Sequence, residues 1–278
     1  MTTRDPAAQA ATSPAVDFYD STYARFGDTL YREIRRDTWH DDFGQNGWIT
    51  APEQDQFIQW LALKPGRRVL DIACGSGGPA LRMAAQSGAS IVGIDIHPDG
   101  IKAGQHEAER RGLSALATFQ VIDAQRPLPF DDSSFDAVVC IDAINHLADR
   151  TRVLREWARI LKPGGHLLFT DPAVVTGPLT NHEIAARSSI GFFLFVPADT
   201  NDRAIADAGL RLTAKADLSD ALAHVATNWH AARQKRADEL RSVESAETFE
   251  GQQHFLTTAA QLAQERRLSR PAYLASKP

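Results

Sequence analysis

Residues 69–80 of the chain read VLDIACGSGGPA, an apolar strand followed by a glycine-rich turn and the start of a helix. The turn contains Gly75, Gly77 and Gly78, and residues without a Cβ atom let the backbone adopt positive φ and approach a ligand closely. Pro79 suits the first turn of the helix, where its missing N–H would have no intrahelical partner. The stretch therefore predicts a ligand-binding turn between a strand and a helix, although the G-x-G-x-x-A spacing alone also fits a dinucleotide-binding turn.

Strand and helix patterns alternate around this turn, from Arg67 to Thr170. The runs VLDIA, IVGI, AVVCI and LLF are continuously apolar and rich in β-branched residues, as in parallel strands that helices cover on both faces. Helical patterns separate these runs, and such alternation is typical of βαβ units in an open sheet. We therefore predict an α/β fold with a doubly wound sheet.

The rest of the chain is expected to add helices to this sheet. Residues 1–16 read as a disordered N-terminus, and residues 17–66 as an N-terminal helical cap. Residues 67–278 then form the ligand-binding core, with helical lid insertions at about 172–200 and 219–267. Ligands of open α/β sheets bind at the carboxyl ends of the strands, so we expect the lid to hold a substrate pocket there.

Composition narrows the classes of partner. The chain carries 30 Lys plus Arg against 35 Asp plus Glu, a formal net charge of -5 that gives no basic surface for nucleic acid. Its longest strongly apolar run, residues 191–196, is far shorter than the roughly 20 residues that cross a bilayer. Cys74 and Cys140 cannot build a disulfide framework, and His224 and His230 miss the i, i+4 spacing of a helical metal pair. We expect a cytoplasmic protein without a metal, a membrane segment or a nucleic-acid partner.

Three carboxylates follow successive predicted strands: Asp71, Asp95 and Asp123. A pyrophosphate-binding turn would gain nothing from the negative charge of Asp71, whereas a cationic ligand would be attracted to it. Asp95 lies about 20 residues beyond the glycines, where a carboxylate accepts hydrogen bonds from ribose hydroxyls. Alternatively, Asp95 and Asp123 would be helix N-caps. The set indicates a pocket for a positively charged ribonucleoside such as S-adenosylmethionine, which has sulfonium and ammonium groups.

The same segments resemble the class I S-adenosylmethionine-dependent methyltransferases, in their small-molecule branch. VLDIACGSGG is similar to the first motif of that family, IVGIDIHP to the second, and LKPGGHLLFTD to the region after the motifs. The resemblance covers about residues 67–171, and it implies a Rossmann-like, seven-stranded, mostly parallel sheet with an antiparallel last strand. It also implies S-adenosylmethionine as the cofactor and a small molecule as the methyl acceptor.

The resemblance also assigns cofactor contacts residue by residue. FGQNGWIT, at residues 43–50, is similar to the gate of small-molecule methyltransferases, which puts Trp48 and Thr50 near the cofactor. Trp48 would equally serve as core packing. The cofactor-binding residues implied in this way are Trp48, Thr50, Asp71, Ala73, Gly75, Gly77, Asp95, Ile96, Asp123, Ala124 and Ile141.

Methyl transfer is an in-line displacement, so the protein mainly positions the acceptor and removes a proton from it. The loop after the fourth strand, CIDAINHLADR at residues 140–150, carries His146, whose ordinary pKa suits a general base near neutral pH. Sugar and related methyltransferases often carry paired histidines in this loop, where this chain has Asn145 and His146. Asp171, just after the fifth strand, would orient His146 or the acceptor, or would simply mark a turn.

We therefore predict an enzyme that moves a methyl group from S-adenosylmethionine to an O, N or C atom of a small molecule. An NAD-dependent oxidoreductase and a non-catalytic S-adenosylmethionine-binding protein are the alternatives. Phe192, Phe193 and Phe195 would line the acceptor pocket or belong to the core. The predicted helix face with Trp229 and Arg233 fits a solvated surface or the contact between subunits of a homodimer.

Overall fold

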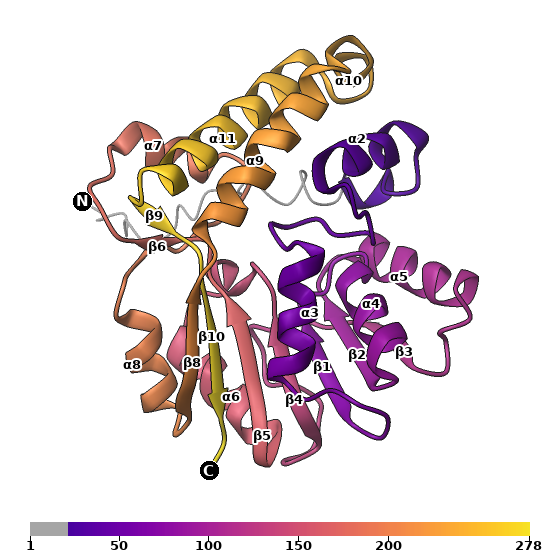
Figure 1. Ribbon diagram of the computed structural model, residues 1–278, viewed down its shortest axis with the longest axis vertical. Helices are drawn as coiled ribbons and strands as arrows, with labels where there is room; N and C mark the ends of the chain where they lie inside the picture. Colours follow the sequence, from indigo (N-terminus) through magenta and orange to yellow (C-terminus); the bar gives the residue numbers. More distant parts are fainter. Residues whose placement is uncertain (1–21) are drawn as a thin grey trace, which may run out of the picture.

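The computed structural model describes residues 22–278, so the segment 1–16 that we expect to be disordered lies outside the described residues. Within residues 22–278, seven strands form the main sheet, seen at the centre of Figure 1. They are β1 (Arg68–Ile72), β2 (Ser90–Asp95), β3 (Ala117–Val121), β4 (Phe135–Cys140), β5 (Leu161–Thr170), β8 (Arg211–Asp217) and β10 (Pro271–Ser276).

The sheet has the strand order β3-β2-β1-β4-β5-β10-β8. Strands β1 to β5 pair in parallel, and β10 runs antiparallel to both β5 and β8. The predicted seven-stranded, mostly parallel sheet with an antiparallel last strand is confirmed. Because the strand order turns back between β1 and β4, the helices after these two strands cover opposite faces and leave a crevice at the carboxyl ends.

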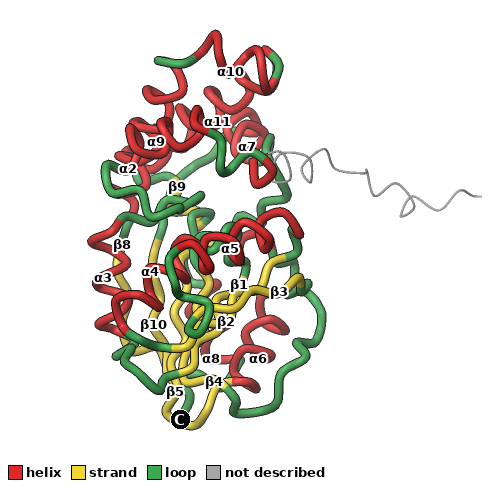
Figure 2. Tube along the Cα trace, turned by 90° about the vertical axis from the view of Figure 1, so that its right-hand side faces the viewer, coloured by secondary structure: helices red, strands yellow, loops and turns green. Residues whose placement is uncertain are grey.

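Helices cover both faces of the main sheet (Figures 1 and 2). They are α3 (Ala51–Trp60), α4 (Gly78–Ser87) and α5 (Pro98–Arg110) on one face, and α6 (Arg150–Ile160) and α8 (Thr200–Asp207) on the other. Along β1, Val69 packs into the apolar cluster under α4 and Leu70 into the cluster under α6, as the alternation of a strand requires. Both side chains are fully buried, which explains why β1 reads as continuously apolar.

A helical lid lies above the carboxyl ends of the strands, at the top of Figure 1. It consists of α7 (Asn181–Arg187), α9 (Ser219–Gln234), α10 (Ala237–Glu244) and α11 (Ala246–Gln264). Helix α9 packs along α11, and α2 (Thr29–Trp39) packs on α9 from the other end of the chain. The stretch predicted as an N-terminal cap therefore divides, because α2 joins the lid and α3 covers the sheet. None of the helices in residues 22–278 combines the length and the apolar character that a membrane span requires.

A small second sheet joins the lid to the core, and the sequence patterns did not predict it. Its strands, in the order β7-β6-β9, are β6 (Val174–Val175), β7 (Val196–Pro197) and β9 (Leu268–Ser269). Strands of two residues are too short to produce a period-two pattern. β6 and β7 lie at the beginning and the end of the first lid insertion, and β9 follows the end of the second one. Their pairing therefore joins the two insertions where they connect to the core.

The face of α9 that carries Trp229 and Arg233 turns into the lid. Arg233 is buried and pairs with Glu244 over 2.6 Å, and the same carboxylate accepts a hydrogen bond of 2.6 Å from Tyr31 on α2. The Trp229 ring centroid lies 5.0 Å from that of Trp39. The expected solvated surface or dimer contact is therefore wrong for this face. It packs against α2, which a helical pattern alone could not identify as its partner.

A buried arginine between β9 and β10 joins three distant parts of the chain. The Arg270 guanidinium donates to both carboxylate oxygens of Asp142, over 2.7 and 3.1 Å, and to Glu53 over 2.8 Å. Asp142 follows β4, and Glu53 lies in the first turn of α3. All three side chains are buried, so the loss of the arginine would leave two buried carboxylates without their cation.

The substitution Arg270→Met is expected to lower the free energy of unfolding by about 3–5 kcal/mol, because it breaks a buried ion pair on one side only. Urea unfolding followed by circular dichroism measures this. Arg203→Met is the control, since Arg203 pairs with Asp199 on the surface and such a pair contributes about 0–1 kcal/mol. Equal unfolding midpoints of the two variants would contradict the prediction.

Candidate active site

A cavity of about 580 Å³ opens at the carboxyl ends of β1, β2, β3 and β4. The residues predicted to bind the cofactor that line it are Asp71, Ala73, Gly75, Asp95, Ile96, Asp123, Ala124 and Ile141. Gly77 does not line the cavity, and it is the N-terminal cap of α4. In residues 22–278 no group of three or more His, Cys, Asp or Glu side chains is placed to hold a metal ion.

The glycine turn forms one wall of this cavity. Gly75 and Gly77 have φ values of +56° and +77°, in the region that favours glycine. A Cβ atom on Gly75 would lie 2.7 Å from the Tyr23 hydroxyl, and one on Gly77 would lie 2.6 Å from the Phe119 ring. Neighbouring segments therefore press on the turn, and a larger residue at either position would displace the backbone that faces the cavity.

Asp71 lies at the end of β1, nearly fully buried beside the cavity. Its Oδ2 atom has no hydrogen-bond partner among the described residues. Burial, and secondarily the nearby Asp95 carboxylate, raises the pKa of Asp71 to about 8. A buried carboxyl group that lacks a partner fits a ligand with a positive group at this point, as the ammonium of S-adenosylmethionine would be.

Asp95 is held rigidly at the end of β2. Its Oδ2 accepts a hydrogen bond of 2.8 Å from the N–H of Gly75, and its Oδ1 accepts one of 2.9 Å from the N–H of His97. The bond from His97 stabilises the start of α5. This contact resembles the helix-capping role that we gave as the alternative for Asp95. Each oxygen keeps a second acceptor position. The carboxylate is therefore oriented to receive the hydroxyl groups of a ribose.

The far end of the cavity is apolar. Ile96 is 56% exposed although it is a large apolar side chain, and it lines the cavity together with Ala124 and Leu147. Asp123 lies at the same end, where its carboxylate accepts a hydrogen bond of 2.8 Å from the N–H of Gln125. An exposed isoleucine beside a cavity fits a flat apolar ring such as adenine, which would cover it.

The gate segment, residues 43–50, does not approach the cavity where we expected. Gly44, Asn46, Gly47 and Ile49 line the cavity, whereas Trp48 and Thr50 do not. The Thr50 side chain caps α3 in a reciprocal capping box. Trp48 lines a second, smaller cavity, and its backbone N–H donates to the Asp142 carboxylate over 2.9 Å. The sequence of residues 43–50 was compatible with both outcomes, because the threonine that resembles part of a cofactor gate is also a typical helix N-cap.

Sequence reasoning missed several residues of the cavity. Ile122 precedes Asp123, and Leu147 follows His146. An apolar residue next to a predicted site residue after a strand could have indicated that both line the cavity. Gly191 reaches the cavity from a segment far away in the sequence, and no local pattern indicates such a contact. Tyr23, which we expected to line the acceptor pocket or to belong to the core, lines this larger cavity.

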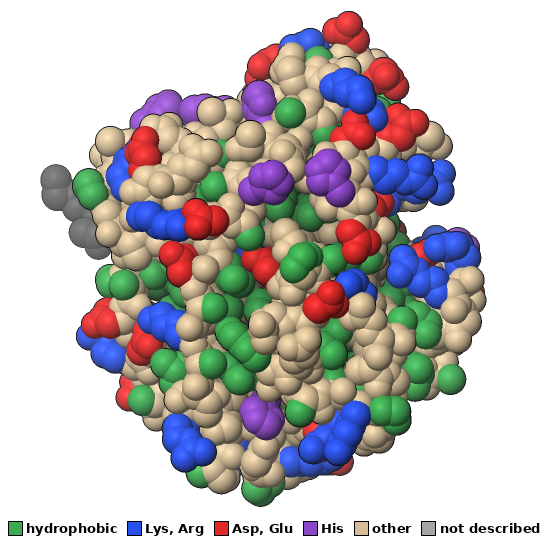
Figure 3. All heavy atoms as spheres, in the orientation of Figure 1, with side chains coloured by type: hydrophobic (Ala, Val, Ile, Leu, Met, Phe, Trp, Pro, Cys, Tyr) green, Lys and Arg blue, Asp and Glu red, His purple; other side chains and the backbone are tan. Residues whose placement is uncertain are grey.

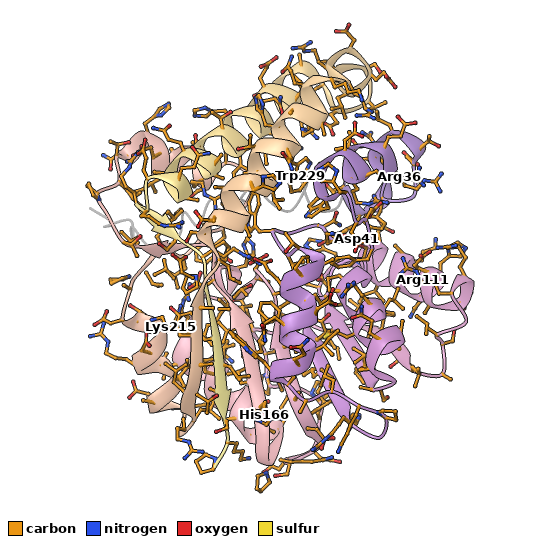
Figure 4. The ribbon with its side chains drawn as sticks, in the orientation of Figure 1. Arg36, Asp41, Arg111, His166, Lys215 and Trp229 are labelled. Carbon is orange, nitrogen blue, oxygen red and sulfur yellow. The ribbon has the colours of Figure 1, made fainter. Side chains whose placement is uncertain are left out.

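The second cavity, here called the aromatic chamber, has a volume of about 60 Å³. It is lined by Asn46, Gly47, Trp48, Asp142, His146, Pro172, Ile190, Phe193, Trp229, Gln252, Phe255 and Leu256. Asn46, Gly47, Asp142 and His146 also line the larger cavity, so the two cavities adjoin at these residues. Figure 4 labels Trp229 on α9, at the junction of the lid and the core.

The walls of the aromatic chamber are held by a buried arginine on α7. The Arg187 guanidinium lies 4.5 Å from the ring centroid of Phe255, 5.3 Å from that of Phe193 and 5.8 Å from that of Trp48. Arg187 is fully buried. A guanidinium over the faces of three rings attracts all three, so it holds these walls of the chamber together.

His146 lies where the two cavities meet. Its Nδ1 is 2.6 Å from the Phe192 carbonyl oxygen, which can only accept, so Nδ1 carries the hydrogen and Nε2 is the basic nitrogen. Nδ2 of Asn145 donates to Nε2 over 3.3 Å in this tautomer, so an acceptor hydroxyl would have to replace this hydrogen bond. Burial lowers the pKa of His146, and the Phe192 carbonyl opposes this in part. The imidazole is therefore neutral near pH 7 and able to accept a proton.

Asp171 has different partners from those we expected. It is fully buried, its Oδ2 forms an ion pair with Arg150, and it accepts a hydrogen bond of 2.8 Å from Asn201. It lines neither cavity. These contacts connect the end of β5 to α6 and α8, and they favour a structural role for Asp171 over the orientation of His146.

Asp71→Asn is expected to weaken the binding of S-adenosylmethionine and to raise the Tm of the cofactor-free protein at pH 7. A carboxyl group whose pKa is raised from 3.8 to about 8 stabilises the fold at low pH and loses this contribution as the pH rises toward 8, which the amide avoids. Because the ammonium of the ligand favours the ionised carboxylate, wild-type affinity should increase as the pH rises toward 8. Calorimetric titration at several pH values measures this, and a wild-type affinity without pH dependence would contradict it.

Comparisons with known proteins identify the family of the chain. Residues 70–169 match the family model of the methyltransferase domain. The chain is 29% identical over 237 residues to the 27-O-demethylrifamycin SV methyltransferase of Amycolatopsis mediterranei, a match that covers 82% of this chain and 85% of that protein. It is 30% identical over 212 residues to the methyltransferase GfsG of Streptomyces halstedii, with 73% of this chain and 75% of that protein covered.

A solved structure extends the likeness to the lid. The mycolic acid cyclopropane synthase CmaA1, complexed with S-adenosylhomocysteine, superposes with a TM-score of 0.80 over 95% of this chain and 99% of that chain, at 17% identity. This likeness shows the fold, and the longer sequence matches show the family. The chain belongs to the class I S-adenosylmethionine-dependent methyltransferases and is an enzyme that transfers a methyl group from S-adenosylmethionine to a small molecule.

Proposed function

We propose that the enzyme methylates a hydroxyl group of a largely apolar small molecule, with His146 as the general base. The observation that carries this proposal is the place of His146, which lines both the cofactor cavity and the aromatic chamber. An acceptor in the chamber would meet the cofactor at this junction. We infer further that Asp71, Gly75 and Asp95 hold the cofactor, with Ile96 against its adenine.

The reaction balances with His146 as the only proton acceptor. When bound, S-adenosylmethionine supplies a methyl carbon made electrophilic by the positive sulfur. Nε2 of His146 would accept the proton of the acceptor hydroxyl as its oxygen takes the methyl group, so the proton released in the transfer has a place on this chain. The lid and the gate segment exclude water from the junction, and they hold the acceptor in line.

The charges around the aromatic chamber support a hydroxyl acceptor over an ammonium. Among the described residues that line the chamber, Asp142 carries the only carboxylate, and both of its oxygens are bound by Arg270. A cationic amine would therefore lose its hydration without gaining a counter-charge. The 27-O-demethylrifamycin SV methyltransferase is named for an acceptor that lacks an O-methyl group, which is consistent with oxygen as the target here.

We also propose how the chain divides the work. Residues 67–171 would bind the cofactor, and the lid insertions, about 172–200 and 219–267, would select the acceptor together with α2. Asp71 would be unfavourable beside a pyrophosphate, which further disfavours the NAD-dependent alternative. Charges of both signs alternate over the face drawn in Figure 3, which with the net charge of -5 supports a protein without a nucleic-acid partner. A cytoplasmic location and a homodimer stay predictions.

The acceptor can be found directly. A metabolite extract is incubated with the enzyme and methyl-deuterated S-adenosylmethionine and is then examined by untargeted mass spectrometry. We expect a labelled O-methyl product that is absent with Asp95→Ala, because this variant loses the hydrogen bonds to ribose. Label found on nitrogen or carbon alone, or in both reactions equally, would contradict the proposal.

His146→Ala is expected to lower kcat by about 10²–10⁴-fold, as for a lost general base, and to leave the affinity for S-adenosylhomocysteine unchanged. Because the pKa of His146 is lowered, wild-type activity should persist at a pH below the ordinary pKa of histidine and fall only in more acidic solution. The control is His224→Ala, since His224 lies on the outside of α9. Equal kcat values for the His146 variant and the wild type would show that the acceptor needs no base from this residue.

A further inference from the structure

The aromatic chamber contains a polar side chain from the middle of the lid. Gln252 on α11 lines the chamber and is 8% exposed. Phe255 and Leu256 follow it by three and four residues, so all three side chains share one face of the helix. This face is otherwise apolar at the chamber, and a glutamine interrupts it.

The lid itself does not account for this glutamine. The side-chain amide of Gln252 makes no hydrogen bond to any described residue. At the next residue, Nε2 of Gln253 donates to the carbonyl oxygen of His230 over 3.2 Å and to Gln234 over 3.1 Å and so ties α11 to α9, although Oε1 of Gln253 has no partner among the described residues. The Gln252 amide faces the chamber rather than a partner in the lid, and an apolar side chain of similar size would suit the packing of this helix face better.

We propose that Gln252 determines acceptor specificity by binding a second polar group, a hydroxyl or a carbonyl, on an otherwise apolar acceptor. The inference rests on the proposed function, in which the reacting hydroxyl lies at His146. A side-chain amide both donates and accepts, so it pairs with either kind of group. The apolar part of the acceptor then lies against the apolar lining of the chamber, such as Ile190, Trp229 and Leu256.

The chamber gives this contact its selectivity. An acceptor that lacks the second polar group would leave the Gln252 amide enclosed by apolar surface and without water or a partner. A site built to hydrogen-bond a substituent rejects the analogue without it more strongly than a purely apolar pocket rejects a change in size. The chamber, at about 60 Å³, also requires the lid to open before a ring-sized acceptor enters, so the amide meets its partner as the lid closes.

Calorimetry on the enzyme saturated with S-adenosylhomocysteine tests the contact without turnover. The probes are 2-naphthol, which has one hydroxyl group, and the isomeric dihydroxynaphthalenes, which add a second one at different positions on the same apolar frame. We expect at least one dihydroxynaphthalene to bind about three- to tenfold more tightly than 2-naphthol, as one buried hydrogen bond would provide.

The variant Gln252→Leu should abolish this difference and should bind 2-naphthol at least as tightly as the wild type, because it has no amide to leave unpaired. Gln261→Leu is the matched control, because Gln261 is on the exposed face of the same helix and faces Glu265. Unchanged affinity for S-adenosylhomocysteine shows that each variant is folded. A preference for the dihydroxynaphthalene that survives in Gln252→Leu would overturn the proposal, as would equal binding or no binding of all probes by the wild type.

The result can be separated from the test of the proposed function. His146→Ala should keep the preference for the second hydroxyl group in binding, since Gln252 is intact, and lose turnover. If the His146 variant retained full turnover while Gln252→Leu lost the preference, the base assignment would fail and the specificity contact would stand. If instead the His146 variant lost turnover while Gln252→Leu kept the preference, the base assignment would stand and the specificity contact would fail.

Discussion

The buried pairing of Arg270 with Asp142 and Glu53 is the interaction on which the rest of the site depends. These residues come from the link between β9 and β10, from the loop after β4 and from α3, so the pairing forms only when all three segments have reached their places. Each charge taken alone would be too costly to bury. The network therefore favours a single arrangement of the gate segment, the core and the returning lid. Because Asp142 also accepts the N–H of Trp48, the same network fixes one wall of the aromatic chamber.

The core of the fold could be predicted because its causes are local. Continuous apolar strands, helices with Pro79 and Pro98 in their first turns, and a glycine turn each follow from a few adjacent residues. The small sheet could not be predicted, since a strand of two residues has no periodicity. The position of α2 could not be predicted either, because an amphipathic helix shows that it has a buried face and does not show which partner covers it.

The candidate site divides in the same way. Asp71, Gly75 and Asp95 lie at strand ends, so the sheet topology alone brings them to one cavity. Trp48, Gln252 and the other walls of the aromatic chamber come from segments whose meeting depends on the lid. Thr50 and Asp171 show a further limit, because a polar residue at the start of a helix or after a strand satisfies the same local pattern whether it caps, pairs or contacts a ligand.

The way in which buried polar groups are satisfied connects the fold to its function. Arg150, Arg233 and Arg270 each find a carboxylate within the chain, and those contacts explain how the lid, α6 and α3 are held. Oδ2 of Asp71 is buried without a partner among the described residues and lies beside the larger cavity, and the largely buried Gln252 lines the aromatic chamber. An unsatisfied buried group destabilises the protein, so its presence is most simply explained by a ligand that completes it. On this argument Asp71 would bind the positive group of the cofactor, and Gln252 would bind a polar group of the acceptor. His146 lies at the junction of the two cavities, where the methyl group would be transferred.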